Sequence, residues 1–191
     1  MIDSLQAAPE GDEVVRADTL RWLERAVIGL NLCPFARGVY VKNQVHVAIS
    51  HATDDAEWLT DLRRELSDLW ALDPSERDTT LLVLPDALAD FLMFNDSLDA
   101  ADAVLHELGL EGHLQIAPFH PRFQFAGTDE DDVTNCTNRS PYPTLHLIRE
   151  TSIDRAVAAF PEAEMIYEVN MATMERLGPQ GWAALDVGPH R

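Results

Sequence analysis

Cysteine and export signals are scarce in this sequence. Cys33 and Cys136 are the two cysteines among 191 residues, too few for a disulfide framework. Residues 1–15 contain neither the basic region nor the apolar segment of a secretion signal. We therefore expect a reduced, cytoplasmic protein.

Basic residues are scarce as well. The 14 Lys and Arg face 33 Asp and Glu, which gives a formal net charge of -19, and Lys42 is the one lysine. A field of this sign repels nucleic acid and anionic membranes. No apolar run approaches the roughly 18 residues that a transmembrane helix needs. We expect no nucleic-acid partner and no membrane partner. An anionic small molecule remains a candidate ligand, because the field of exposed charges is screened beyond about 8 to 10 Å and local donors can outweigh it.

Runs of apolar and β-branched residues predict four strands. They lie in VHVAIS (45–50), TTLLVLP (79–85), GHLQIAPF (112–119) and PTLHLIRE (143–150). The second run is apolar on both faces and is typical of a central strand. Helical periods between the strands predict an α+β (mixed α/β) fold with a single sheet of about four strands and helices packed on it.

Helix signals and chain ends complete the predicted organisation. Asp18 is a plausible N-cap for the first helix, Asp54 and Glu57 form a capping-box pattern, and residues 86–108 are helical with a potential break at NDS. We expect a flexible N-terminal tail over 1–16, one globular domain over 17–178 and an irregular C-terminal tail over 179–191.

About two dozen residues separate the third strand from the fourth, far more than a hairpin needs. Disorder would expose Phe119, Phe123, Phe125 and Tyr142 to water, at about 25 cal/mol per Å² of apolar surface. We therefore expect the loop to fold back onto the domain, where a polar, ordered loop is a good scaffold for a site.

Several distinctive segments follow one another along the chain. They are GLNLCPFARGVY, TTLLVLP, QIAPFHP, FAGT, DD, TNRSPYP and LHLIRE. With these segments in this order, about residues 18–177 resemble the bacterial and plastid family known as domain of unknown function 1415. The resemblance implies no activity that can be carried over residue by residue. The candidate site therefore rests on the chemistry of its own residues.

Four residues are candidates for catalysis. His120, at the end of the third strand, is a candidate general acid/base. Cys33 would be the N-cap of a helix that restarts at Pro34. The pKa of a thiol can fall at this position, and the thiol can then serve as a nucleophile or redox group. The alternative is that Cys33 is a buried cysteine that only packs in the core. Asp131 or Asp132 could orient a catalytic partner, or belong to a solvated acidic turn.

Five polar residues around the end of the loop are candidates for substrate binding. An arginine near apolar strand residues needs an anion, because an unpaired charge there is costly. For Arg139 and Arg149 that anion is either a substrate carboxylate or phosphate, or an internal salt bridge to Asp131, Asp132 or Glu150. His146 is either part of the site or a hydrogen-bonded sheet histidine. The full set is Asn138, Arg139, Ser140, His146 and Arg149.

These residues support three kinds of function. The first is a small cytoplasmic enzyme that acts on an anionic small molecule in a pocket formed by Cys33, His120, the 127–140 loop and the fourth strand. The second is a non-catalytic metal- or cofactor-binding module that uses His120, His146 and Cys33. No short ligand spacing such as C-x-x-C occurs, so the sequence assigns no metal and no particular cofactor. The third is a structural or interaction protein.

Overall fold

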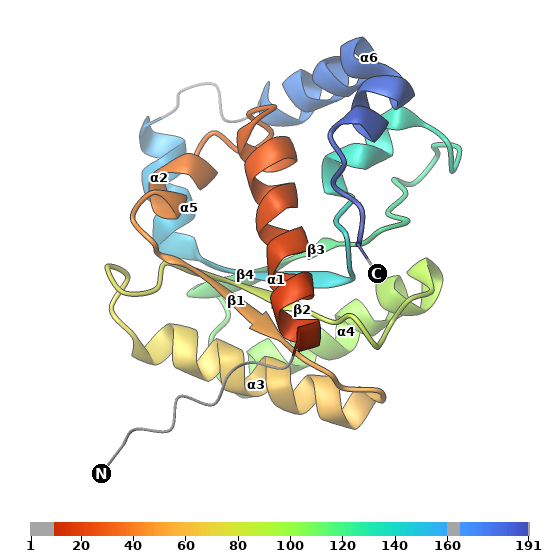
Figure 1. Cartoon of the computed structure of the whole chain (residues 1–191). Coiled ribbons are helices and arrows are strands. Elements are labelled where there is room, and N and C mark those ends of the chain that lie inside the picture. The colour runs from red at the N-terminus through yellow and green to blue at the C-terminus, as the bar shows by residue number, and fades with distance from the viewer. Residues whose placement is uncertain (1–9, 160–164, 191) are drawn as a thin grey trace.

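One open four-stranded sheet forms the centre of the protein (Figure 1), seen in a computed structural model that describes residues 10–159 and 165–190. Its strands are β1 (Val45–Ile49), β2 (Thr79–Val83), β3 (Leu114–Phe119) and β4 (Thr144–Arg149), in the spatial order β1-β2-β4-β3. β1 and β2 are parallel, whereas β4 is antiparallel to both of its neighbours. The predicted α+β class with a single four-stranded sheet is confirmed, and β2 is a central, fully buried strand as expected.

Helices surround the sheet above and below (Figure 1). They are α1 (Glu10–Trp22), the π-helical η1 (Leu23–Ile28), α2 (Ala36–Tyr40), α3 (Asp55–Ala71), α4 (Phe91–Glu107), the 3-10 helix η2 (Val133–Asn138), α5 (Glu150–Ala159) and α6 (Ile166–Ala184). Within the described ranges, no helix is both long and apolar enough to cross a membrane.

The sheet has a different apolar core on each face. On the lower face in Figure 1, α3 and α4 pack on β2, β3 and β4 through residues that include Leu62, Leu66, Phe94, Leu82 and Leu145. On the upper face, α1 and η1 pack on β1 and β2 through Trp22, Val27, Val47, Leu81 and Val83. Alternate residues of each strand point to opposite faces, so neighbours in sequence belong to different cores. This division separates several of the candidate site residues.

Both predicted tails are corrected by the structure. Helix α1 begins at Glu10, so a flexible tail over 1–16 is wrong for residues 10–16, and the remaining residues of that tail lie outside the described ranges. Asp18 lies inside this helix rather than at its N-cap. The predicted irregular C-terminal tail is wrong for residues 179–184, whereas residues 185–190 form no helix or strand, as predicted. α6 kinks at Gly178, which has a φ of 67°, and then continues past Pro179 to Ala184.

The local helix signals gave mixed results. Asp54 accepts a hydrogen bond from the Glu57 backbone N–H at 2.9 Å, and Glu57 accepts one from the Thr53 backbone N–H at 3.0 Å, so the capping box is confirmed. α4 passes through the NDS segment without a break, and Gly109 follows it with a φ of 67°.

Arg149 caps the C-terminal end of helix α3. Its side chain is only 5% exposed, and its guanidinium donates to the backbone carbonyls of Leu69, Leu72 and Arg77. Two of these carbonyls lie at the C-terminal end of α3, where the last carbonyls have no partner within the helix and favour a cation. The donors of Arg149 are therefore engaged, and this placement does not support its predicted role in substrate binding.

We predict that Arg149→Met lowers the free energy of unfolding by about 3 kcal/mol, because buried carbonyls lose a charged donor. Urea denaturation measures this change. Arg63→Met is the matched control, since Arg63 pairs with Glu107 at the exposed surface and should cost less than about 1 kcal/mol. Equal effects of the two substitutions would contradict the capping role.

Candidate functional site

The long loop between β3 and β4 folds back onto the domain, as predicted, but its η2 segment packs against α6. Asn135, which is fully buried, organises the loop. Its side-chain oxygen accepts from the Phe125 backbone N–H at 2.9 Å and from the Thr128 hydroxyl at 2.8 Å, while its amide nitrogen donates to the Asp129 carbonyl at 2.8 Å. Every polar atom of this side chain thus holds a different part of the loop.

Arg139 is held by the same loop. Its Nε donates to the Phe123 carbonyl at 3.2 Å and its Nη2 to the Glu130 carbonyl at 2.7 Å. Its Nη1 makes only a long contact, 4.0 Å, with the Cys136 sulfur. Within residues 10–159 and 165–190, no carboxylate pairs with Arg139, so the alternative of an internal salt bridge is wrong.

Residues 185–190, here named the C-terminal strap, run back over α1. Arg21 fixes the strap by donating to the carbonyls of Asp186 at 2.7 Å and Gly188 at 2.9 Å. Arg25 donates to the Leu185 carbonyl at 2.9 Å. Val187 is buried in the core on the α1 face. The strap is therefore an integral part of the fold.

A cavity of about 170 Å³ lies between the strap and the loop. Its walls are formed by Pro121, Arg139, Ser140, Trp182, Val187, Gly188 and Pro189. Two of the predicted binding residues, Arg139 and Ser140, thus meet at one concave surface. Among the described residues of this lining, Arg139 is the one that is charged, and it carries the sign opposite to that of the whole protein.

Several donors on the cavity walls are unused. The indole N–H of Trp182 and the backbone N–H of Gly188 have no hydrogen-bond acceptor among the described residues, and Arg139 Nη1 has only the long bond to the Cys136 sulfur. The Ser140 hydroxyl donates to the Tyr142 carbonyl at 2.6 Å, so its oxygen is left as an acceptor. The lining is rich in donors, and its described residues include no carboxylate.

A buried carboxylate joins the two walls of the cavity. Asp18, 1% exposed, accepts from the Tyr142 hydroxyl at 2.7 Å, from the His190 backbone N–H at 2.8 Å and from Arg21 at 2.7 Å. Burial by itself raises the pKa of Asp18, but hydrogen bonds from His190, Tyr142 and Arg21 outweigh burial, and the pKa lies below its usual value. Asp18 therefore stays ionised and ties the loop to the strap.

His120 lies away from this cavity wall, on the face of the sheet that α4 covers. Its fully buried ring packs against Phe91 and Phe94 of α4. Nδ1 accepts from the Arg122 backbone N–H at 3.0 Å, so the neutral ring carries its proton on Nε2, which donates to the Leu88 carbonyl at 3.0 Å. Burial lowers the pKa of His120. Both nitrogens are engaged, and the general acid/base role stays a prediction without support from this geometry.

Cys33 and His146 are on the opposite face, with α1. Cys33 lies in the turn before α2 and packs on the core of that face, and the N-cap of α2 is Phe35, so the predicted N-cap position of Cys33 is wrong. The Thr79 hydroxyl donates to the Leu147 carbonyl, so His146 Nε2 donates to the Thr79 oxygen at 2.7 Å. Burial lowers the pKa of His146 to about 4. This is the hydrogen-bonded sheet histidine that the sequence left as an alternative.

The remaining candidates have local roles in the loop. Asp132 is the N-cap of η2 and accepts from the Thr134 hydroxyl and backbone N–H, which together lower the pKa of Asp132. Asp131 is exposed. The Asn138 side chain donates to the Pro118 carbonyl at 3.4 Å. None of these contacts places a carboxylate beside His120 or Cys33.

The structure does not assemble the alternative metal site. His120 is on one face of the sheet, whereas His146 and Cys33 are on the other. In the part of the chain that the structure describes, no group of three or more His, Cys, Asp or Glu side chains is arranged to hold a metal ion.

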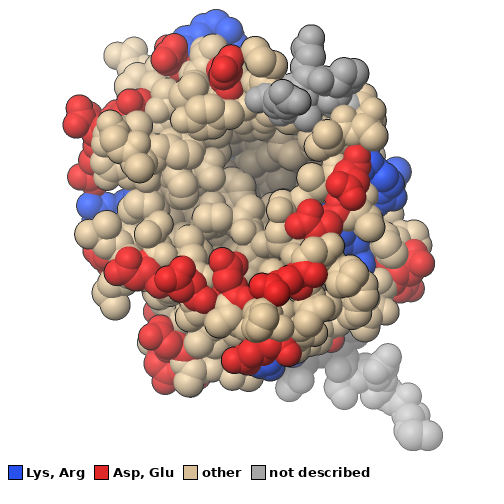
Figure 2. Space-filling model, turned by 180° about the vertical axis from the view of Figure 1, so that it is seen from behind, with Lys and Arg blue, Asp and Glu red and all other residues tan. Residues whose placement is uncertain are grey.

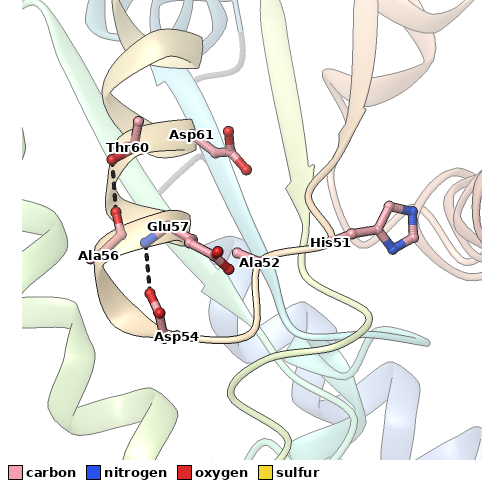
Figure 3. A pocket seen from close by; sticks show the side chains of 7 residues that line it. All are labelled: His51, Ala52, Asp54, Ala56, Glu57, Thr60 and Asp61. Atoms are coloured by element: carbon pink, nitrogen blue, oxygen red, sulfur yellow. Dashed lines mark hydrogen bonds between the residues drawn. The ribbon is translucent and has the colours of Figure 1, made fainter.

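Sequence reasoning missed a second, wider pocket of about 570 Å³ beside α3 (Figure 3). Its walls include His51 and three carboxylates, those of Asp54, Glu57 and Asp61. The carboxylates already accept hydrogen bonds from Glu57, Thr53 and Ser50 respectively, and Figure 3 shows the His51 ring pointing away from them. An open acidic pocket of this kind repels anions. It is the weaker candidate for an anion site.

His51 instead bridges two aspartates. Its Nε2 lies 2.6 Å from Asp12 of α1, and its Nδ1 lies 2.6 Å from Asp86, which follows β2. The hydrogen bonds with Asp12 and Asp86 raise the pKa of His51. The sequence predicted the strand that ends just before His51, but the expected flexible tail hid Asp12.

The fold and the cavity define an α+β protein with one mixed sheet and a small cationic cavity under its C-terminal strap. Residues 14–184 match the family described as "Protein of unknown function (DUF1415)". Since the match covers most of the chain, the protein belongs to this family, as its motifs indicated. No curated protein and no solved structure matches the chain.

We predict that the stabilising effect of His51 disappears at high pH. A histidine whose pKa is raised by folding contributes stability that is complete below its unfolded pKa of about 6.5 and is lost as pH rises through the folded pKa. The stability difference between wild type and His51→Gln should therefore shrink from about pH 6 to about pH 9. A wild-type NMR titration that places the His51 pKa at or below about 6.5 would contradict the bridge.

Proposed function

We propose that this protein binds a small anionic molecule in the cavity between the loop and the C-terminal strap, with Arg139 as the anion-binding residue. The observation that carries the proposal is the composition of the cavity wall, which in the described part of the chain has one guanidinium and no carboxylate. A guanidinium without a carboxylate partner retains its full attraction for an external anion, although two of its nitrogens are engaged by carbonyls.

The rest of the protein is acidic, unlike the wall of this cavity. Figure 2 shows many Asp and Glu side chains and few Lys and Arg on the face opposite to that of Figure 1, including a band of acidic side chains below a hollow. With a net charge of -19, a partly enclosed cavity that lacks any acidic side chain is the place where an anion meets least repulsion. Exposed charges farther away than about 8 to 10 Å are screened at physiological salt, so the local guanidinium dominates.

The proposal is one of binding. An enzyme that uses His120 and Cys33 together would need both side chains at one surface. They lie on opposite faces of the sheet, and both ring nitrogens of His120 already have backbone partners. The Cys136 thiol lies close to Arg139, but burial raises its pKa, which disfavours the nucleophilic thiolate.

We also propose a cytoplasmic location. Cys33 and Cys136 are both free thiols, which suits a reducing compartment.

We predict that a small anion raises the melting temperature of the wild type and that Arg139→Gln abolishes this effect. A ligand that binds only the folded state stabilises it in proportion to the logarithm of its saturation. The measurement is thermal unfolding in sulfate, phosphate and short carboxylates at constant ionic strength. Arg139→Gln itself should lose about 1 to 3 kcal/mol of stability, because two loop carbonyls lose their donor.

The matched control is Arg176→Gln, which removes the same charge from an exposed position on α6. Its anion response should equal that of the wild type. An anion effect of equal size in wild type and both variants would show nonspecific stabilisation and would overturn the proposal.

A further inference from the structure

The cavity is more selective than a general anion site, because its walls are mostly apolar. Around Arg139 and Ser140 lie two proline rings, those of Pro121 and Pro189, together with the Val187 and Trp182 side chains. Val187 is 6% exposed and Trp182 packs on two of the core clusters, so these walls are fixed by the fold. A ligand that fills the cavity must place apolar atoms against them.

The charge of the lining limits the charge of the ligand. A single guanidinium neutralises one negative charge, and Arg139 is the only charged residue on the wall among residues 10–159 and 165–190. A second negative charge would be taken from water into a partly enclosed, mostly apolar space without a counterion, which is costly. Other charges at the strap are already paired: Arg21 with Asp18, and Arg25 with Asp186. The site therefore favours a monoanion over a dianion.

The hydrogen-bonding groups of the cavity wall also favour a monoanion. Nε and Nη2 of Arg139 donate to the Phe123 and Glu130 carbonyls, and Nη1 makes only the long hydrogen bond of 4.0 Å to the Cys136 sulfur. The fork formed by Nε and Nη2, one of the two that could hold two oxygens of a phosphate side by side, is thus occupied by carbonyls. One carboxylate oxygen can bind Nη1, and the Trp182 indole N–H and the Gly188 backbone N–H are further donors on the same wall.

The volume limits the length of the ligand. The cavity of about 170 Å³ is smaller than the roughly 300 to 1,000 Å³ of a typical ligand pocket. A short aliphatic acid suits this space better than a nucleotide does.

We infer that the ligand is a short aliphatic monocarboxylate, whose carboxylate binds Arg139 and whose hydrocarbon part lies against Val187, Pro121, Pro189 and Trp182. This inference rests on the proposed function, since it names the chemical class of the anion that the cavity takes. It requires the apolar walls to contribute to affinity as well as the charge.

The test is isothermal titration calorimetry at constant ionic strength with four probes of similar size: propionate, its neutral isostere propionamide, inorganic phosphate and sulfate. Propionate should bind the wild type at least about tenfold more tightly than the other three. Arg139→Gln should weaken propionate binding by about tenfold or more, and Arg176→Gln should leave it unchanged.

A second measurement on the wild type keeps the test valid if Arg139→Gln fails to fold. In ¹⁵N-labelled protein, propionate should shift the resonances of the Trp182 indole N–H and the Gly188 amide. The Trp58 indole N–H, which donates to Asp55 within α3 at 2.9 Å, is the internal control and should not move.

The outcomes separate the two proposals. If phosphate or sulfate binds as tightly as propionate and depends on Arg139, the monocarboxylate inference is wrong and the anion site stands. If propionamide binds as tightly as propionate, the charge plays no part and the inference is wrong. If no probe binds in a manner that depends on Arg139, or shifts the Trp182 and Gly188 resonances, both proposals are overturned.

Discussion

The buried carboxylate of Asp18 is the interaction on which the candidate site depends. It lies in α1, yet its partners Tyr142 and His190 are distant in sequence, at 2.7 and 2.8 Å. An ionised group 1% exposed is tolerated only when hydrogen bonds and a cation replace its hydration. Asp18 therefore fixes where the loop before β4 and the end of the chain must lie, and the cavity between them is a consequence.

The loop reaches its position by a different set of bonds. Asn135 and Arg139 bind backbone carbonyls and N–H groups of the loop that no sheet or helix would satisfy. Two nitrogens of Arg139 thus hold the loop by hydrogen bonds, and its charge still has no carboxylate partner among the described residues. The structure places this charge at a wall shared with the strap, in a protein whose net charge is -19.

The sheet was readable from the sequence because strand periods and apolar runs are local signals. The four strands, the central place of β2 and the capping box at Asp54 all follow from neighbours within a few residues. Asp18 was misread for the same reason. An Asp before an apolar helical period is a good N-cap signal, and nothing nearby shows that Tyr142 and His190 will bind it. Gly178 and Pro179 are likewise a good stop signal, although here they mark a kink.

The candidate site was predictable only in part. The loop, Arg139 and Ser140 were identified from composition and from the donors that they supply. The roles of His120 and Arg149 could not be predicted, because their partners are the Leu88 carbonyl and the carbonyls at the end of α3. Every residue has a backbone carbonyl, so the sequence does not show which of them a side chain will bind. Trp182 and Gly188 were missed because the C-terminal segment has no period, and its position is set by Arg21, Arg25 and Asp18.

Hydrogen exchange at the His190 backbone amide in Asp18→Asn tests the central claim most directly. Asparagine keeps the shape of the side chain and removes its charge. If Asp18 ties the strap to the loop, exchange at His190 should become much faster, the amides of β2 and β4 should stay protected, and the protein should lose about 3 kcal/mol of stability. Unchanged His190 exchange together with unchanged stability would contradict the account.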